Sequence, residues 1–341
     1  MPRSIALLLI ALWLPLSAEC SVYDWTHSFH FENDLFIGTD SDYTNGMKYS
    51  IISPDLVPQH QPLRKTAKLP RKVLDFFHQF PLIKKAPAQT GYKVELAFGQ
   101  NMYTPQDISR FDLISNDRPY AGYSYLSTAY HRKSDDGRIW SQMDTLEVQI
   151  GMVGPASLAE DAQKFVHRVR GLQRPNGWDH QLKDEPGLTL AFERKWLYHP
   201  THHRRFCADA IAHTGATIGN VMTYANAGLE LRAGWNIPRS FAASLIRPAG
   251  SSWTINESGF SLYLFGAVNG RAVLRDIFLD GNSFRSSHHV DKEPLVVDTS
   301  TGVTVRYEKL SVSVAYTRRT REFDQQQKHH GFGSMVISYA F

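Results

Sequence analysis

The sequence predicts an all-β protein, an antiparallel transmembrane β-barrel of about twelve strands that carries a short helix in one extracellular loop. Apolar and polar residues alternate in many short segments, as in strands with one face towards lipid and the other towards water. After residue 20 no stretch approaches the ~18 consecutive apolar residues of a spanning helix. The last alternating segment places Met335, Ile337, Tyr339 and Phe341 on one face, which suits a strand that closes a barrel.

The N-terminal residues predict export. A short basic start, an apolar run over residues 5–16 and the small-x-small sequence Ala18-Glu19-Cys20 are typical of a secretory signal peptide. We therefore expect residues 1–20 to be the signal peptide and residues 21–341 to be the outer-membrane barrel domain. Lipidation of Cys20 is the alternative. The terminal Phe341 also resembles the insertion signal of bacterial outer-membrane proteins.

The strands follow from the alternation. In the clearest segment, residues 225–235, every odd position holds an apolar side chain. Asn226, Glu230 and Arg232 lie between them. The expected strand spans are 28–36, 44–52, 92–99, 120–131, 144–152, 187–198, 204–217, 222–236, 257–276, 293–307, 310–323 and 331–341. A short amphipathic helix is expected at residues 72–80. A soluble β-sandwich is the alternative fold, because alternation alone does not distinguish lipid from a protein core.

Charge gives a weaker constraint. The net charge is +4 over 341 residues, and the basic residues are scattered rather than gathered in a patch. This excludes the usual pattern of a nucleic-acid-binding protein.

Three polar stretches come to one end of the expected barrel, because strands alternate in direction and both termini are expected in the periplasm. They are residues 31–46, 103–122 and 154–187, and the third contains a predicted helix at residues 157–171. Gln163 and His167 are four residues apart and share one helix face. Each motif alone also fits a structural role: Asn33 and Asp34 could cap a turn, and a lone His is more often structural. Their common location favours a functional site.

The motifs together resemble the lipid A 3′-O-deacylase family. They are Phe31-Glu32-Asn33-Asp34, Asp42-Tyr43-Thr44-Asn45-Gly46, Tyr103-Thr104-Pro105, Asn116-Asp117-Arg118-Pro119-Tyr120-Ala121-Gly122, Gly154-Pro155 followed by Gln163 and His167, and Gly177-Trp178-Asp179 with Gln181. The resemblance implies a twelve-stranded barrel in the bacterial outer membrane. It also implies calcium-dependent ester hydrolysis that removes the 3′-linked acyloxyacyl group of lipid A. The site would lie between the barrel wall and a helix, on the extracellular-leaflet side.

The resemblance also implies partners and roles. The partners would be lipid A or lipopolysaccharide and the surrounding outer-membrane lipids, with the protein expected to be a monomer. His167 suits the base that activates water, because an imidazole exchanges a proton near neutral pH. Asn33 and Asp34 would bind Ca²⁺ or orient the imidazole, and Thr44 would position water or substrate.

Three further residues would contact the substrate. Arg110 would face the oxyanion or a lipid A phosphate. Gln163 shares the helix face of the base. Gln173 stands where relatives carry Glu, and an amide cannot supply the negative charge of that residue.

Two alternatives remain for the function. The sequence has no Gly-x-Ser-x-Gly elbow, so activated water is favoured over direct attack by a loop serine. The barrel could also be a pore or a surface-binding scaffold without catalytic activity, since a fold does not fix a function. A pore would distribute charged residues around an open lumen, whereas a lipid hydrolase needs its His beside the lipid-facing wall.

Overall fold

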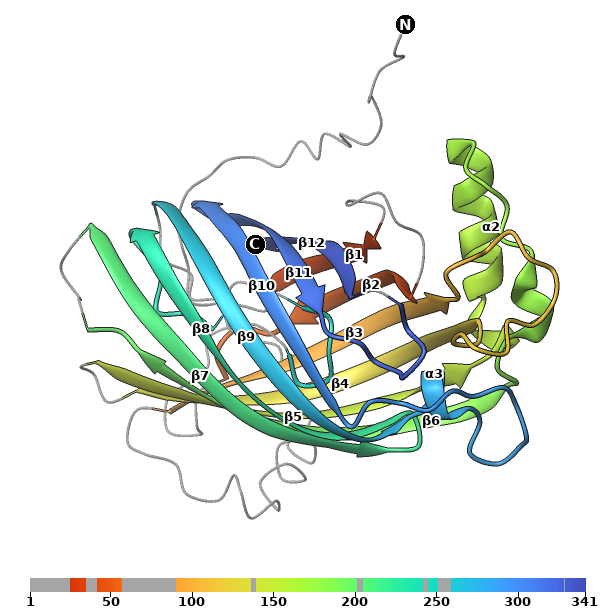
Figure 1. The fold of residues 1–341 in the computed structure, drawn as a ribbon. Coiled ribbons are helices and arrows are strands. Elements are labelled where there is room, and N and C mark those ends of the chain that lie inside the picture. The colour runs from red at the N-terminus through yellow and green to blue at the C-terminus, as the bar shows by residue number, and fades with distance from the viewer. Residues whose placement is uncertain are drawn as a thin grey trace, which may run out of the picture.

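The computed structural model is a closed antiparallel barrel of twelve strands, in which β1 pairs with both β2 and β12 (Figure 1). It describes residues 25–34, 42–56, 90–135, 139–200, 205–241, 245–250, 259–327 and 329–341. The strands are β1 (Thr26–Asn33), β2 (Asp42–Ile52), β3 (Thr90–Thr104), β4 (Ala121–Asp135), β5 (Trp140–Val153), β6 (Glu185–Tyr198), β7 (Phe206–Gly219), β8 (Met222–Trp235), β9 (Phe260–Asp276), β10 (Leu295–Tyr307), β11 (Leu310–Arg319) and β12 (His330–Ala340).

The predicted fold is confirmed. Each of the twelve expected spans overlaps one strand, although β1 ends at Asn33 and β11 at Arg319, earlier than expected, while β3 continues to Thr104. The expected signal peptide and the expected helix at residues 72–80 lie outside the described residues. None of the helices among the described residues is long and apolar enough to cross a membrane.

The alternation sets the two faces of the wall. On β8, Leu229, Leu231 and Trp235 are exposed on the outer face, while Asn226 and Glu230 are buried in the lumen. A β-sandwich would bury its apolar face between two sheets, whereas here the apolar series faces outwards from a closed sheet. This excludes the sandwich alternative.

Charged side chains in the lumen lie in close pairs. Lys48 Nζ is 2.8 Å from Glu95 Oε1, and Arg319 Nε donates to Asp298 Oδ1 at 2.6 Å. Buried charges are tolerated only when they are paired and hydrogen-bonded in this way. The lumen is therefore a packed polar interior.

Residues 245–250, in the connection between β8 and β9, enter the lumen and bind its carboxylates. Ile246 N donates to Glu32 Oε1 at 2.6 Å, and Ala249 N donates to Glu147 Oε2 at 2.7 Å. Arg247 NH2 donates to Glu193 Oε1 at 2.9 Å. Because Glu32 is the next-to-last residue of β1, this segment reaches almost to the far end of the barrel.

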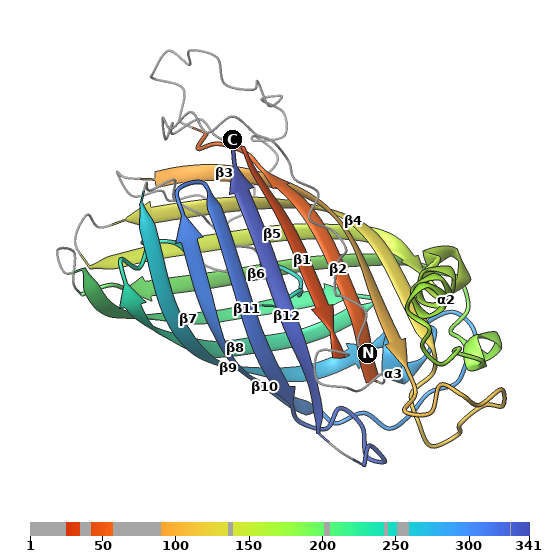
Figure 2. The ribbon, with the colours of Figure 1, turned by 90° about the horizontal axis from the view of Figure 1, so that it is seen from above.

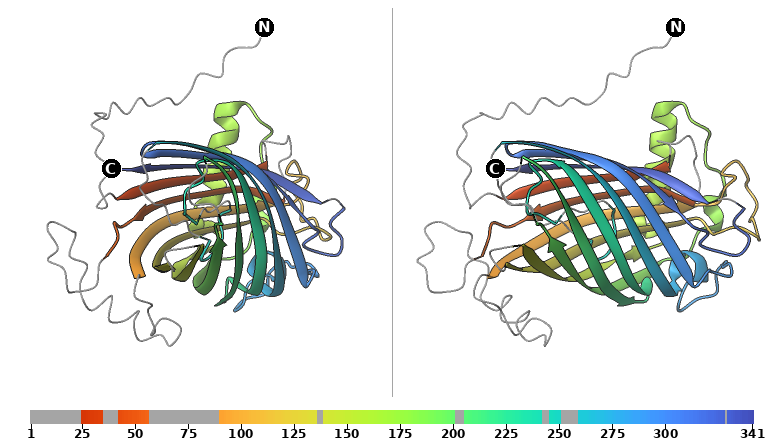
Figure 3. Two further views of the ribbon diagram at one scale, coloured as in Figure 1. Left: turned by 90° about the vertical axis from the view of Figure 1, so that its left-hand side faces the viewer. Right: turned by 60° about the vertical axis from the view of Figure 1, so that its left-hand side comes forward.

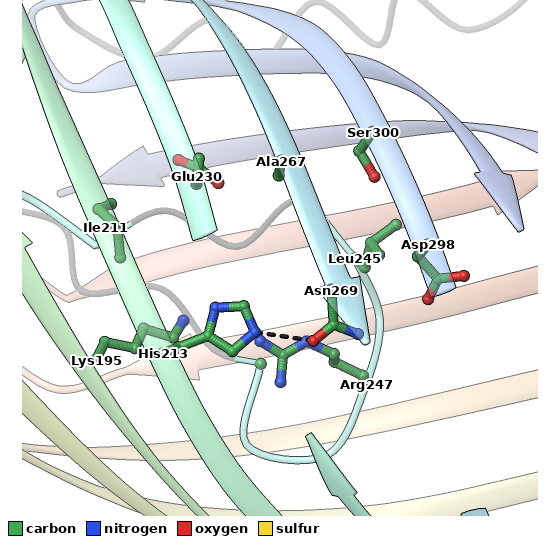
Figure 4. Close-up of a pocket in the computed structure, with 11 residues that line it drawn as sticks. Lys195, Ile211, His213, Glu230, Leu245, Arg247, Ala267, Asn269, Asp298 and Ser300 are labelled. Carbon is green, nitrogen blue, oxygen red and sulfur yellow. Dashed lines mark hydrogen bonds between the residues drawn. The ribbon is translucent and has the colours of Figure 1, made fainter. Parts of the chain in front are cut away.

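The space left beside this segment is small. Figure 4 shows Arg247 next to His213 and Asn269, which are joined by a 2.8 Å hydrogen bond, in a cavity of about 40 Å³. That volume suits a few water molecules. At the other end of the lumen α3 (Ile277–Asp280) stacks Phe278 on Tyr103, with ring centroids 4.1 Å apart.

The main helix, α2 (Ala159–Arg170), lies in the connection between β5 and β6, at the end of the barrel opposite Phe341 (Figure 3). The 3-10 turn η3 (Pro155–Ser157) precedes it, and Gly171 ends it in the left-handed conformation with φ 66°. Glycine adopts this backbone angle without the steric cost of a Cβ atom. The predicted helix at residues 157–171 is confirmed.

We predict that the purified protein forms no steady open channel in planar lipid bilayers. Residues 245–250 and Phe278 occupy the lumen among the described residues, so we expect them to interrupt the path that ions would need. Single-channel recording tests this, with a porin of known conductance as the positive control. Porin-like steady conductance would revive the pore alternative.

Candidate active site

The predicted residues Asn33 and Asp34 lie where β1 ends. On β1 the even residues from Thr26 to Glu32 are buried in the lumen, whereas Phe29 is exposed on the outer face. Asn33 continues the outer series, yet only 8% of it is exposed. Asp34 follows the strand and is fully buried. Because the strand stops between them, these neighbours are not forced to opposite sides of the wall.

A β-bulge places Thr44 on the adjacent strand. The pairing of β2 with β3 shifts between Tyr43 and Asn45, which leaves Thr44 as the extra residue. Its hydroxyl is 2.7 Å from that of Thr104, and both residues are buried. Thr104 belongs to the outer series of β3, and Asn33 lies opposite Asn45 in the register. These polar groups therefore lie on three neighbouring strands at one end of the wall.

Helix α2 is attached to the outside of β3 and β4. The Ser157 carbonyl accepts hydrogen bonds from Gln100 Nε2 at 2.8 Å and from Ser124 Oγ at 2.6 Å. A Cβ atom at Gly122 would lie only 2.2 Å from Ala159 Cβ. Glycine is thus required for the first turn of the helix to contact the strand directly.

One stripe of α2 is buried: Ala159, Gln163 and His167, four residues apart. Trp178, in the 3-10 turn η4 (Gly177–His180), donates its indole N–H to Gln163 Oε1 at 2.7 Å. An indole N–H can only donate, so the amide oxygen of Gln163 must face Trp178. The Gln163 NH₂ group then points the other way, and this buried donor has no hydrogen-bond acceptor within the described residues.

The imidazole of His167 is oriented by the chain that follows the helix. Its Nδ1 lies 2.5 Å from the backbone carbonyl oxygen of Gln173. Since a carbonyl only accepts, Nδ1 carries the proton and Nε2 carries the lone pair of a neutral ring. His167 is 3% exposed. The side chain of Gln173 is exposed, so its contact with the buried stripe is made by the backbone.

Arg110 lies on the surface. Its guanidinium donates to the Asp112 carboxylate, with Nε 3.1 Å from Oδ1, and this hydrogen bond raises the pKa of Arg110 and lowers the pKa of Asp112. The loop itself is tied to η4, because Asn176 Nδ2 donates to the Ser109 carbonyl at 2.9 Å. The structure thus brings the backbone around Arg110 close to the α2 connection and leaves the side chain outside.

Four residues of this region were not predicted as site residues from the sequence: Gln100, Thr104, Ser124 and Trp178. Thr104 and Trp178 stand within motifs that carry the family resemblance, which is the signal that could have identified them. Gln100 and Ser124 are polar residues on the outward face of β3 and β4. The next outward residues on the same strands, Phe98 and Leu126, are apolar.

The oxygen donors near Asp34 are of one chemical type. A carboxylate, the Asn33 amide and the hydroxyls of Thr44 and Thr104 are hard ligands, which Ca²⁺ prefers over nitrogen or sulfur. No group of three or more His, Cys, Asp or Glu side chains that could hold a metal ion occurs in the part of the chain that the structure describes. The donor types therefore fit calcium, with neutral oxygens in the majority.

Comparison with known proteins identifies the family. The family model described as "Outer membrane protein LpxR" matches residues 4–341. The chain belongs to the LpxR family. This confirms the resemblance to the lipid A 3′-O-deacylase family, and the barrel fold and the LpxR family both place the protein in the bacterial outer membrane.

The solved structure of an LpxR protein supports the fold. LpxR from Salmonella typhimurium matches with a TM-score of 0.66 and 16% identity, over 93% of this chain and 100% of that chain. The β domain of the Bordetella autotransporter BrkA matches with a TM-score of 0.43 and 8% identity, over 94% and 98% of the two chains. A comparison with curated proteins gave no match.

We predict that Gly122→Val displaces the start of α2 in this LpxR-family barrel. The new side chain must push against Ala159 and Ser157, an overpacking that costs about 1–3 kcal/mol. Trypsin should then cleave faster after Lys164, Arg168 and Arg170, as followed by gel and mass spectrometry.

Gly266→Val is the matched control, because a Cβ atom at Gly266 on β9 has no neighbour within 4 Å. Equal cleavage rates in the two folded variants would contradict the close contact of α2 with β4.

Proposed function

We propose that the protein hydrolyses an ester of lipid A, removing the 3′-linked acyloxyacyl group. The observation that carries this proposal is the buried stripe of α2, which holds an oriented imidazole on the lipid side of the barrel wall. Family membership supports the substrate class. The packed lumen argues against the pore alternative, since an open channel needs a path that residues 245–250 occupy.

His167 is the proposed general base. With Nδ1 donating to the Gln173 carbonyl, Nε2 accepts a proton from water while the water oxygen attacks the ester carbonyl carbon. Collapse of the tetrahedral intermediate breaks the bond between the carbonyl carbon and the 3′-oxygen. The proton on Nε2 then passes to that oxygen, which gives a free 3′-hydroxyl and a free acyloxyacyl acid.

Gln163 is the proposed oxyanion donor. Its NH₂ group is buried, lacks an acceptor among the described residues and is directed by the bond from Trp178. A preorganised donor of this kind stabilises the charge that develops on the carbonyl oxygen. Arg110 is proposed to bind a lipid A phosphate, which requires it to exchange its Asp112 partner for the substrate.

Asp34 and Asn33 are the proposed calcium ligands, and Thr44 positions water or substrate. The bound ion would supply positive charge near the ester and near the phosphates of lipid A. The alternative nucleophile is a loop serine. Ser157 is the serine closest to the start of α2, and its hydroxyl already donates to the Gly154 carbonyl at 2.6 Å.

The first test is replacement of the base. His167→Asn should leave the barrel folded and lower deacylation by about 10²–10⁴-fold, because an amide cannot accept the proton. Mass spectrometry of lipid A incubated with each protein measures the loss of the 3′ acyloxyacyl group.

Gln163→Glu serves as a second variant in the same assay. A carboxylate can still accept from Trp178 but replaces the proposed oxyanion donor with a negative charge, so turnover should fall. Normal turnover by a folded His167→Asn variant would remove His167 from the mechanism. An acyl-enzyme intermediate trapped on a serine would favour the alternative nucleophile.

The second test concerns the metal. Chelation should abolish activity and Ca²⁺ should restore it, and Asp34→Asn should raise the Ca²⁺ concentration for half-maximal activity more than Asn33→Ala does, because Asp34 supplies the charge. Activity that survives exhaustive chelation would contradict a calcium requirement.

Gln173→Glu tests, in the same measurement of the Ca²⁺ requirement, whether Gln173 acts through its backbone or through its side chain. Since Gln173 meets His167 through its carbonyl and its side chain is exposed, the calcium requirement should stay unchanged. A lower requirement would instead place the side chain at the metal.

A further inference from the structure

Helix α2 has an exposed apolar surface that the described residues of the barrel leave uncovered. Leu158, which caps the helix, is 62% exposed, and Phe165 and Val169 are 63% and 68% exposed. We call these three residues the apolar flank. Their spacing of seven and four residues puts them on one side of the helix, turned away from the buried stripe of Ala159, Gln163 and His167.

The contacts of Ser157, which precedes Leu158, fix the position of this flank along the barrel axis. Phe98 on β3 and Leu126 on β4 face each other in the register and are exposed on the lipid-facing wall. Two residues further, Gln100 and Ser124 bind the Ser157 carbonyl. Two strand residues span about 7 Å, so Leu158 begins α2 directly at the edge of the apolar belt.

The helix also has the direction of a helix at a membrane surface. Figures 1 and 2 show α2 from the side and end-on, while the strands run across both pictures, so it lies across the strand direction. An amphipathic helix that lies in the interface buries its apolar side among acyl chains and keeps its cations at the headgroups.

Cations stand beside the apolar flank. Arg168 and Arg170 lie in the last turn of α2 and Arg174 follows it, and all three are exposed. Within the described ranges no carboxylate forms a salt bridge with any of them. Glu160 and Asp161, in contrast, lie in the first turn, where Lys164 pairs with Glu160.

We propose that α2 docks into the outer leaflet, with the apolar flank among the acyl chains and Arg168, Arg170 and Arg174 on lipid phosphates. The occupant is the phosphorylated lipid that surrounds the barrel, because the flank continues the belt that this lipid already covers. Docking covers the exposed side of α2 with lipid. The other side is already fixed by hydrogen bonds from Gln100, Ser124 and Trp178. The surface does not depend on the proposed hydrolysis.

The test places an environment-sensitive fluorophore on the helix. Phe165→Cys and Val169→Cys are made in a Cys207→Ala background, labelled and reconstituted into nanodiscs that contain anionic phospholipid with brominated acyl chains. Glu160→Cys is the matched control, because Glu160 is a half-buried residue of the same helix on the side away from the flank. Labels at 165 and 169 should shift to the blue and be quenched by bromine, while the label at 160 should not.

The contribution of the arginines is tested in the same system. Arg168→Gln with Arg170→Gln should reduce quenching at 169 several-fold in anionic nanodiscs and leave it unchanged in zwitterionic ones. Labels at 165 and 169 that stay unquenched in anionic nanodiscs, with the barrel folded, would overturn the proposal. Because neither readout uses hydrolysis, that result would leave the tests of His167 unaffected.

Discussion

The pairing of β1 with β12 is the constraint on which the other features depend. A sheet in hydrocarbon cannot leave a row of backbone N–H and C=O groups without partners, so the barrel must close, here from Thr26 opposite Ala340 to Asn33 opposite Gly333. Closure also fixes which residues of each strand face outwards. A slip of one residue in β1 would turn Asn33 into the lumen and expose Glu32, which binds Ile246 inside, to lipid.

The wall thus carries two surfaces that serve different purposes. Inside, paired charges and residues 245–250 make a solid support, in which side chains have little freedom to move. Outside, the change from Phe98 and Leu126 to Gln100 and Ser124 ends the apolar belt and provides the hydrogen bonds that seat α2. A helix fixed in this way on a rigid wall can hold His167 and Gln163 in one geometry, which a mobile loop would not.

The sequence predicts the strands and the helix well, because alternation and a C-terminal glycine are local signals. It cannot predict features that depend on the backbone or on distant partners. Any residue type could present the backbone carbonyl that Gln173 offers to His167, so the sequence does not predict this contact. The Thr44 bulge changes the parity of β2 without altering the composition, and residues 245–250 resemble an ordinary loop although they fill the lumen. The charge of Arg110 predicts a place at the site, whereas the structure pairs its side chain with Asp112 on the surface.

The proposed site outside the wall would also explain why the lumen can be filled. A substrate with several acyl chains would have to leave the membrane to enter the barrel, which would expose its chains to water at about 0.8 kcal/mol per CH₂ group. At the proposed site beside α2 the same lipid would keep its chains in the leaflet while its headgroup reached the level of Gln100 and Ser124. The lumen would then have no part in substrate access. Its interior could be filled by the inserted segment and by charges that are paired, since a buried charge without a partner is strongly destabilising.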